Sequence, residues 1–352
     1  MIKEDIRIEE ARQAILSTLQ RIPELADIQV EPETWTDKYR ADLLVLFRKQ
    51  NDRKTVLVEV GSSGQPRPAR AAVNSLKTLL SNRSVPYGVF VAPYISDASA
   101  EICKDSGIGY IDFVGNCWLH FDSIFMEIKG SPNRFRRKSE LKSLFKPKAE
   151  RILRTLLHEQ GRQWLTAKLA EAAVVSPSQV SNVRKLLLER EWIQDQKRGI
   201  KLSEPLQLLA SWLANYESNR NTVYEFYDMG STGEIEATIA TLCSHRQARY
   251  AFTGFSGAAR YAPFTTYKTV TVYMDNVNAN NLGDLPFKPV TSGANLRIIS
   301  PYDEGVYYGT RSIGGQTVAS AIQCYLDLKD EKARGEEAAG ALLEQVIKPS
   351  WQ

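Results

Sequence analysis

The chain of 352 residues lacks the long apolar runs that would place it in a membrane. No segment approaches the roughly 18 uncharged apolar residues that a spanning helix needs. The first residues, Met1–Asp5, turn polar at once and do not begin an apolar signal core. Because apolar residues still make up 43% of the chain and charged residues 24%, we expect a globular cytoplasmic protein with no membrane partner.

Cysteine and histidine are also scarce, and their spacing argues against the common metal sites. The four cysteines form no CxxC pair and, with the three histidines, no cluster of zinc-like spacing. We therefore expect reduced, mostly buried thiols, structural histidines and no cofactor. The residues concerned are Cys103, Cys117, Cys243, Cys324, His120, His158 and His245.

Basic charge, in contrast, is concentrated in one place. The formal net charge is only +4, but between residues 134 and 154 nine cations stand against Glu140 and Glu150, which gives nine minus two, or +7. Such a block favours attraction of phosphate groups, and the alternative is a solvated linker. The cations are Arg134, Arg136, Arg137, Lys138, Lys142, Lys146, Lys148, Arg151 and Arg154.

Length and pattern divide the chain into three domains and a linker. At roughly 150 residues per domain, two or three domains are expected. We assign residues 1–132 to the first domain, 133–146 to a basic linker, 147–205 to the second domain and 206–352 to the third. The expected fold class is multidomain α/β.

The first domain alternates between helical and β patterns. Apolar residues at three- and four-residue spacing predict a first helix over residues 4–21. Short β-rich runs then predict the order α-β-β-β-α-β with additions. The predicted strands are 28–30, 41–47, 55–60, 87–91, 110–113 and 124–128, and the further helices are 66–80 and 97–105.

Asp42 begins the second of these strands, and Glu59 ends the third. This arrangement resembles the PD-(D/E)xK restriction-endonuclease-like fold, whose carboxylates bind magnesium and whose lysine, two residues after the glutamate, helps to activate water. Gly61 occupies that lysine position, so we expect a degenerate site on a retained scaffold. The alternative is an Mg²⁺- or Mn²⁺-dependent endonuclease in which Asp42 and Glu59 bind the metal and act in catalysis, with Gln65 positioning the substrate.

The second domain shows the pattern of a winged helix-turn-helix. Pro147 begins a helix, Thr166 caps a second, short helix, and Ser176 caps a third that extends to about residue 191. Residues 192–202 alternate apolar and polar side chains around a basic turn, which predicts a two-stranded wing.

The third helix of this domain has an apolar and a polar face. Val180, Val183, Leu186 and Leu187 recur at helical spacing, which assigns them to the core. On the opposite face, Gln and Asn side chains can pair with adenine, and Arg and Lys side chains with phosphate or guanine. The predicted contacts to double-stranded DNA are Ser178, Gln179, Ser181, Asn182, Arg184, Lys185, Lys197, Arg198 and Lys201. The alternative is a module for protein contacts.

The third domain has a mixed α/β pattern. Residues 250–261 predict a strand that passes through a small-residue turn into a helix, and a later strand ends at Asp275. These parts resemble a nucleotidyltransferase fold, but no second carboxylate adjoins Asp275, so we expect the small residues to serve packing. Residues 298–309 predict a strand leading to an aromatic strand. Helices are expected at 206–216, 323–328 and 335–343.

Several phrases together resemble the AbiEi-like antitoxins and transcriptional regulators of type IV toxin–antitoxin systems, in a long form with an N-terminal endonuclease-like domain. The resemblance implies binding near the protein's own promoter, autoregulation and neutralisation of a nucleotidyltransferase-like toxin. The phrases are Val91–Tyr94, Gly109–Asp112, Gly115–Cys117, Thr253–Ala259 and Pro301–Val306.

From the sequence we predict a DNA-binding transcriptional regulator rather than an enzyme. A metal-dependent endonuclease guided by the winged helix and a toxin-neutralising protein-binding module are the alternatives. A palindromic operator would imply a homodimer.

Overall fold

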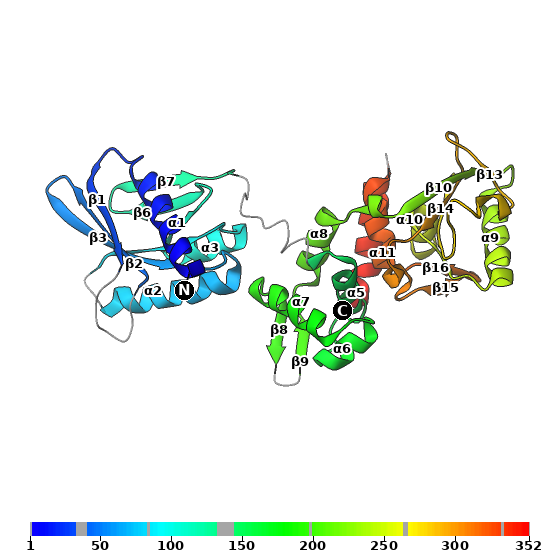
Figure 1. Ribbon diagram of the computed structural model, residues 1–352, viewed down its shortest axis with the longest axis horizontal. Coiled ribbons are helices and arrows are strands. Elements are labelled where there is room, and N and C mark those ends of the chain that lie inside the picture. The colour runs from blue at the N-terminus through cyan, green and yellow to red at the C-terminus, as the bar shows by residue number, and fades with distance from the viewer. Residues whose placement is uncertain are drawn as a thin grey trace. The chain divides into compact units, whose positions relative to one another are not determined.

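The computed structural model describes residues 2–32, 41–82, 85–131, 144–196, 199–262, 267–331 and 334–351. The chain forms two compact units, the first from residues 1–141 and 186–191 and the second from residues 142–185 and 192–352. Each unit contains a seven-stranded sheet, which makes the protein a mixed α/β, multidomain chain (Figure 1).

The sheet of the first unit has its strands in sequence order, from β1 to β7. Strand β4 pairs in parallel with β3 and with β5, and the other neighbours pair antiparallel. The strands are β1 (Leu25–Pro32), β2 (Leu43–Lys49), β3 (Asp52–Val60), β4 (Tyr87–Ala92), β5 (Gly109–Asp112), β6 (Cys117–Phe121) and β7 (Ile124–Ile128). The helices are α1 (Ile2–Leu19), α2 (Pro66–Asn82) and α3 (Asp97–Asp105).

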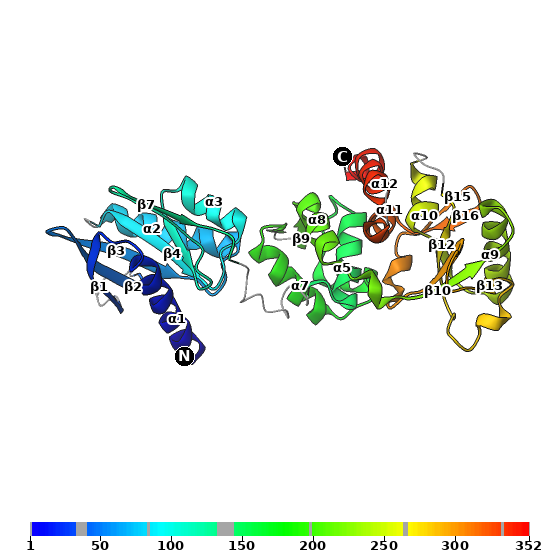
Figure 2. The same ribbon diagram turned by 90° about the horizontal axis from the view of Figure 1, so that it is seen from above.

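Alternating side chains along β3 explain why helices lie on both faces of this sheet. Val56, Val58 and Val60 belong to the core cluster that contains residues of α1, whereas Leu57 belongs to the cluster that contains residues of α2 and α3. Successive side chains of a strand point to opposite faces. Helix α1 therefore covers one face, and α2 and α3 cover the other (Figure 2).

Three helices and a hairpin follow along the chain, and all of this stretch except residues 186–191 belongs to the second unit. They are α5 (Pro147–His158), α6 (Thr166–Ala172), α7 (Pro177–Glu189), β8 (Ile193–Gln196) and β9 (Gly199–Leu202). The element order agrees with the sequence prediction, but the predicted cap of the second helix is wrong. Thr166 is the first residue of α6, and the capping position is held by Leu165, which makes no side-chain cap.

The rest of the second unit is built on a sheet of order β13-β10-β14-β12-β11-β16-β15. Helix α9 packs Ile235, Ile239 and Cys243 against this sheet, and Figure 2 shows α9 and α11 on opposite sides of its strands. The strands are β10 (Thr222–Tyr227), β11 (Tyr250–Phe252), β12 (Val270–Met274), β13 (Lys288–Pro289), β14 (Leu296–Ser300), β15 (Arg311–Ile313) and β16 (Gln316–Val318). The α-helices are α8 (Pro205–Asn215), α9 (Thr232–Arg246), α10 (Gly254–Tyr261), α11 (Ala321–Asp327) and α12 (Gly335–Leu342).

One predicted strand of this unit is wrong. The aromatic segment after β14 forms a 3-10 helix, η3 (Glu304–Tyr307), because Asp303 caps it by accepting from the Gly305 amide at 2.8 Å. The other short helices are the 3-10 helices η1 (Ser218–Arg220), η2 (Leu282–Asp284), η4 (Leu328–Asp330) and η6 (Pro349–Trp351) and the π-helix η5 (Leu343–Ile347).

Cys103, Cys117, Cys243 and Cys324 are free and buried, as expected. Burial raises the pKa of Cys103 to about 12 and that of Cys117 to about 11. Thiols held neutral in this way are poor nucleophiles. Over the described ranges, no helix is long and apolar enough to cross a membrane.

Candidate nucleic-acid interface

Helix α7 begins at a turn that its own sequence defines. The Ser176 hydroxyl accepts from the Gln179 amide at 3.2 Å, as predicted for a cap. Pro177 occupies the first helical position, where no amide donor is needed. The preceding turn is closed by hydrogen bonds from Val174 N to Glu171 O, at 3.2 Å, and from Val175 N to Ala170 O, at 2.9 Å.

The helix separates buried apolar side chains from exposed polar ones. Val180 and Val183 are fully buried. The exposed set consists of Ser178, Ser181, Asn182 and Lys185, with Gln179 half-buried beside it. Ser181 donates to the carbonyl of Pro177 at 3.1 Å, so its hydroxyl is turned back onto its own helix. Gln179, Asn182 and Lys185 are the longest polar side chains of this face.

Arg184 is held by an internal ion pair. Its guanidinium lies against the carboxylate of Asp195 on β8, and the two side chains are 34% and 40% exposed, respectively. The structure thus brings a predicted DNA-contacting cation together with an acid of the hairpin. A phosphate that bound Arg184 would have to compete with Asp195.

The hairpin is fixed to the helices through Trp164. Trp164 exchanges two backbone hydrogen bonds with Ile200, at 2.8 and 2.9 Å. Gly199 has φ +123°, and a Cβ there would lie 2.2 Å from the carbonyl oxygen of Trp164, so only glycine fits. Lys201 is half-buried on β9, opposite Gln194. Lys197 and Arg198 lie outside the described residues.

The predicted basic block has two different parts. Its first cations, Arg134 to Lys142, lie outside the described residues, and Lys146 and Lys148 are exposed at the start of α5. Arg151 and Arg154, however, are buried and face acids and amides of the unit. The interpretation of the whole block as a phosphate-attracting surface is therefore wrong for these two arginines.

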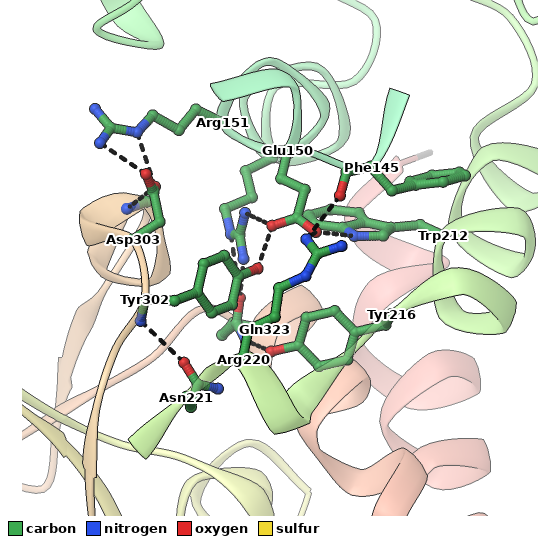
Figure 3. A network of polar contacts seen from close by, with 12 residues as sticks. Phe145, Glu150, Arg151, Trp212, Tyr216, Arg220, Asn221, Tyr302, Asp303 and Gln323 are labelled. Carbon is green, nitrogen blue, oxygen red and sulfur yellow. Dashed lines mark hydrogen bonds and ion pairs between the residues drawn. The ribbon is translucent and has the colours of Figure 1, made fainter. Parts of the chain in front are cut away.

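Arg151 joins α5 to the loop that precedes η3. Its Nε and Nη2 donate to the two oxygens of Asp303 at 2.8 and 2.9 Å (Figure 3). Its Nη1 donates to Glu304 at 2.9 Å. Burial alone would raise the pKa of Asp303, but the hydrogen bonds from Arg151 and from the Gly305 amide hold it below its ordinary value. The planar fork geometry makes this one of the stronger kinds of ion pair.

Further along α5, two buried charged residues face the same part of the unit. Glu150 accepts from the Tyr302 hydroxyl and from Trp212 Nε1, the latter at 3.4 Å. Arg154 donates to the side-chain oxygen of Gln323 at 3.1 and 2.7 Å. Sequence reasoning missed this network because the partners are 62 to 169 residues apart in the chain.

The small-residue turn before α10 is filled by packing, as expected. Ser256 is fully buried and donates to the carbonyl of Thr271 at 2.9 Å. A Cβ at Gly257 would lie 2.7 Å from both Cys324 Sγ and the carbonyl oxygen of Phe252. Asp275 accepts from Arg249 Nε at 2.6 Å. Ser256 and Gly257 close the junction of α10 with β11, β12 and α11.

The carboxylates of the predicted nuclease site make hydrogen bonds within the first unit. Asp42 accepts from the Val60 amide at 2.7 Å, and Glu59 accepts from the Ser75 hydroxyl at 2.6 Å. Gly61 stands against the buried Phe90 ring, and a Cβ there would lie 2.7 Å from its Cε2 atom. Gln65, half-buried, precedes α2. In the part of the chain that is described, no three His, Cys, Asp or Glu side chains are grouped to hold a metal.

Asp112 ends the segment Gly109–Asp112, one of those that resemble the AbiEi-like family, and it is a structural residue. It is fully buried and accepts from the amides of Val114 and Asn116 at 3.1 and 2.8 Å, and from Asn116 Nδ2 at 2.8 Å. Burial raises the pKa of Asp112 despite these hydrogen bonds. The carboxylate therefore shapes the turn between β5 and β6.

Comparison with known proteins gives a match for only part of the chain. No curated protein and no solved structure matches it. Residues 201–348, which run from β9 through the C-terminal sheet, match the family described as transcriptional regulator, AbiEi antitoxin, type IV TA system.

Proposed function

We propose that this protein is a DNA-binding transcriptional regulator, with residues 147–205 forming a winged helix-turn-helix. The observation that carries the proposal is the exposed polar face of α7 over the buried Val180 and Val183. In this type of module, the N-terminal part of the third helix enters the major groove. Gln179 and Asn182 would read base edges, and Lys185 would contact phosphate.

The family match supports a regulatory role of the antitoxin type. Residues 201–348 resemble regulators that are also antitoxins of type IV systems. We therefore propose that the protein binds DNA upstream of its own gene, and that a toxin is the partner of the C-terminal sheet. Binding at that position would make the protein a regulator of its own transcription.

For the first unit we propose an endonuclease-like scaffold without catalysis. Asp42 and Glu59 hold backbone and side-chain donors of their own unit. The lysine that an active site of this type uses would collide with Phe90 if it stood at position 61. The unit then contributes structure or DNA-contacting surface rather than hydrolysis.

The test is binding of the full-length protein to labelled upstream DNA and to random DNA of equal length, with and without Mg²⁺ or Mn²⁺. We expect preferential retardation of the upstream fragment and no cleavage. Gln179→Ala and Asn182→Ala should erode the preference, whereas Lys185→Ala should weaken binding to both fragments and reduce its salt dependence by about one unit of slope. Lys268→Ala, an exposed lysine just before β12, is the charge-matched control. Equal effects of all four variants on both fragments would contradict the assignment.

A further inference from the structure

The loop before η3 and the turn before α7 meet at one side chain, Arg151. We propose that Arg151 is a positioning residue for DNA binding, through which Asp303, in the loop between β14 and η3, holds the turn that orients α7. This inference rests on the proposed function, because it concerns how the DNA-contacting helix is held. Arg151 does not itself contact DNA.

The turn between α6 and α7 has an unfavourable backbone. Val174 has φ +52° and is 65% exposed. A β-branched side chain is a genuine outlier in this left-handed region, which glycine adopts freely. Such a residue persists when its surroundings hold it in place. The turn, residues 173–176, therefore depends on contacts from outside these four residues.

Arg151 supplies one of those contacts. Its Nη1 donates to the carbonyl oxygen of Val174 at 3.4 Å, in addition to Glu304 at 2.9 Å. The guanidinium is fixed by its fork on Asp303, so it cannot turn freely toward another acceptor. Without Asp303, the contact to Val174 would be one of several positions open to a long side chain.

The loop is shaped to approach α5 closely. A Cβ at Gly305 would lie 2.9 Å from Arg151 Cγ, and a Cβ at Gly309 would lie 2.6 Å from the His158 ring. Tyr308 also donates to Glu159 at 2.9 Å. Residues 302–309 thus contact α5 along much of its length. A partner that displaced this segment would move the support of the turn before α7.

The experiment compares Asp303→Asn with Glu236→Gln in full-length protein. Glu236 forms another largely buried fork, with Arg260, which joins α9 to α10 and is completed by the Tyr267 hydroxyl. We expect Asp303→Asn to lower the preference for upstream over random DNA about tenfold. The slope of affinity against salt should not change, because no phosphate contact is lost. Glu236→Gln should keep the wild-type preference. Arg151→Lys, which keeps the charge but not the fork, should resemble Asp303→Asn.

A rescue separates positioning from general destabilisation. Val174→Gly removes the unfavourable φ, so in the Asp303→Asn background it should restore most of the preference. If the double variant binds like Asp303→Asn alone, or if Glu236→Gln shows the same loss, Arg151 has no positioning role.

Amide exchange of the free protein tests the contact without DNA. We expect Asp303→Asn, but not Glu236→Gln, to speed exchange at Val174 and Val175, whose amides close the turn. Unchanged exchange at both amides would overturn the inference. If the wild-type protein shows no preference for upstream DNA, the proposed function fails, and the exchange measurement still decides whether Asp303 supports the turn.

Discussion

Buried polar side chains have different reach in the two units. In the first unit, Asp112 bonds to residues two and four positions away in one turn, and its most distant bond, to the Ile95 amide at 3.4 Å, spans 17 positions. In the second unit, Arg151 and Glu150 of α5 bond to residues 152 positions away and join two parts of the chain. A polar substitution should therefore act locally in the first unit and across the whole body in the second.

The largest effect is expected from Glu150→Gln. Glu150 is 1% exposed and lies 3.6 Å from Arg154, which is itself 3% exposed. Removing this charge leaves a buried arginine without its acid, which costs about 3 kcal/mol of unfolding free energy. Denaturation by urea, followed at tryptophan fluorescence, measures it. Glu159→Gln, at a more exposed pair with Arg162, is the control and should cost under about 1 kcal/mol. Equal losses of unfolding free energy in the two variants would show that the burial of Glu150 and Arg154 does not set the size of the effect.

Asp112→Asn should destabilise the first unit by about 2 kcal/mol, because buried amides lose a charged acceptor. Amide exchange should accelerate at Val114 and Asn116, whose amides bond to Asp112. Amides of α5 serve as the internal reference. Faster exchange there as well would show that the effect is not local.

Gly61→Lys restores the missing lysine of the predicted nuclease site in the first unit. Because the new Cβ would meet the buried Phe90 ring, we expect a loss of about 1 kcal/mol and no metal-dependent cleavage. Thermal unfolding and a plasmid-nicking assay with Mg²⁺ or Mn²⁺ are the measurements. Cleavage that appears with Gly61→Lys and disappears on adding Glu59→Ala would instead show a site that lacks only its lysine.

Asp195→Asn should have a smaller effect, confined to the affinity for DNA. Its carboxylate pairs with Arg184 and is about 40% exposed, so its loss should change stability little. It should free Arg184 and strengthen binding to any DNA about twofold. Gel retardation at two salt concentrations measures this. Weaker binding would mean that the pair holds Arg184 in its productive position.

The smallest effect concerns pH. Burial and the charge of Arg311 lower the pKa of His158 from its ordinary value of 6.5, while Glu159 opposes the shift. Since the folded state binds this proton less readily than the unfolded state, its contribution to stability is present above the ordinary pKa and is lost as the pH falls below it. His158→Gln should flatten the fall in stability between about pH 7 and about pH 5. An unchanged pH profile would exclude His158 as the cause.

Much of the architecture could be predicted from local patterns. Alternating and helical spacings of apolar residues predicted α3, and the elements from α5 through β9, to within a few residues. This was possible because caps such as Ser176 and stops such as Gly161 are local signals. Helix α9 was missed although Ser231 and Glu234 form a capping box at its start. That box was the available signal. The 3-10 turn at Glu304–Tyr307 could not be separated from a strand, because its aromatic residues suit both.

The candidate interface was only partly predictable for a physical reason. The exposed face of α7 follows from its spacing, whereas the ion pair of Arg184 and the burial of Arg151 and Arg154 depend on residues elsewhere in the fold. Charge in the sequence gives no information about which cations already have acids beside them. Of the nine cations between residues 134 and 154, two are buried and bond to side chains of their own unit.

Because residues 302–309 contact α5, the domain boundary predicted between residues 205 and 206 separates two sequence patterns but not two mechanically independent parts. A fragment ending there would bring Glu150, Arg151 and Arg154 into water without their partners. A chimera that exchanged only the helices and hairpin between related proteins would inherit a helix matched to the wrong loop. In natural and in engineered variants, substitutions in α5 and in residues 302–309 should therefore occur together.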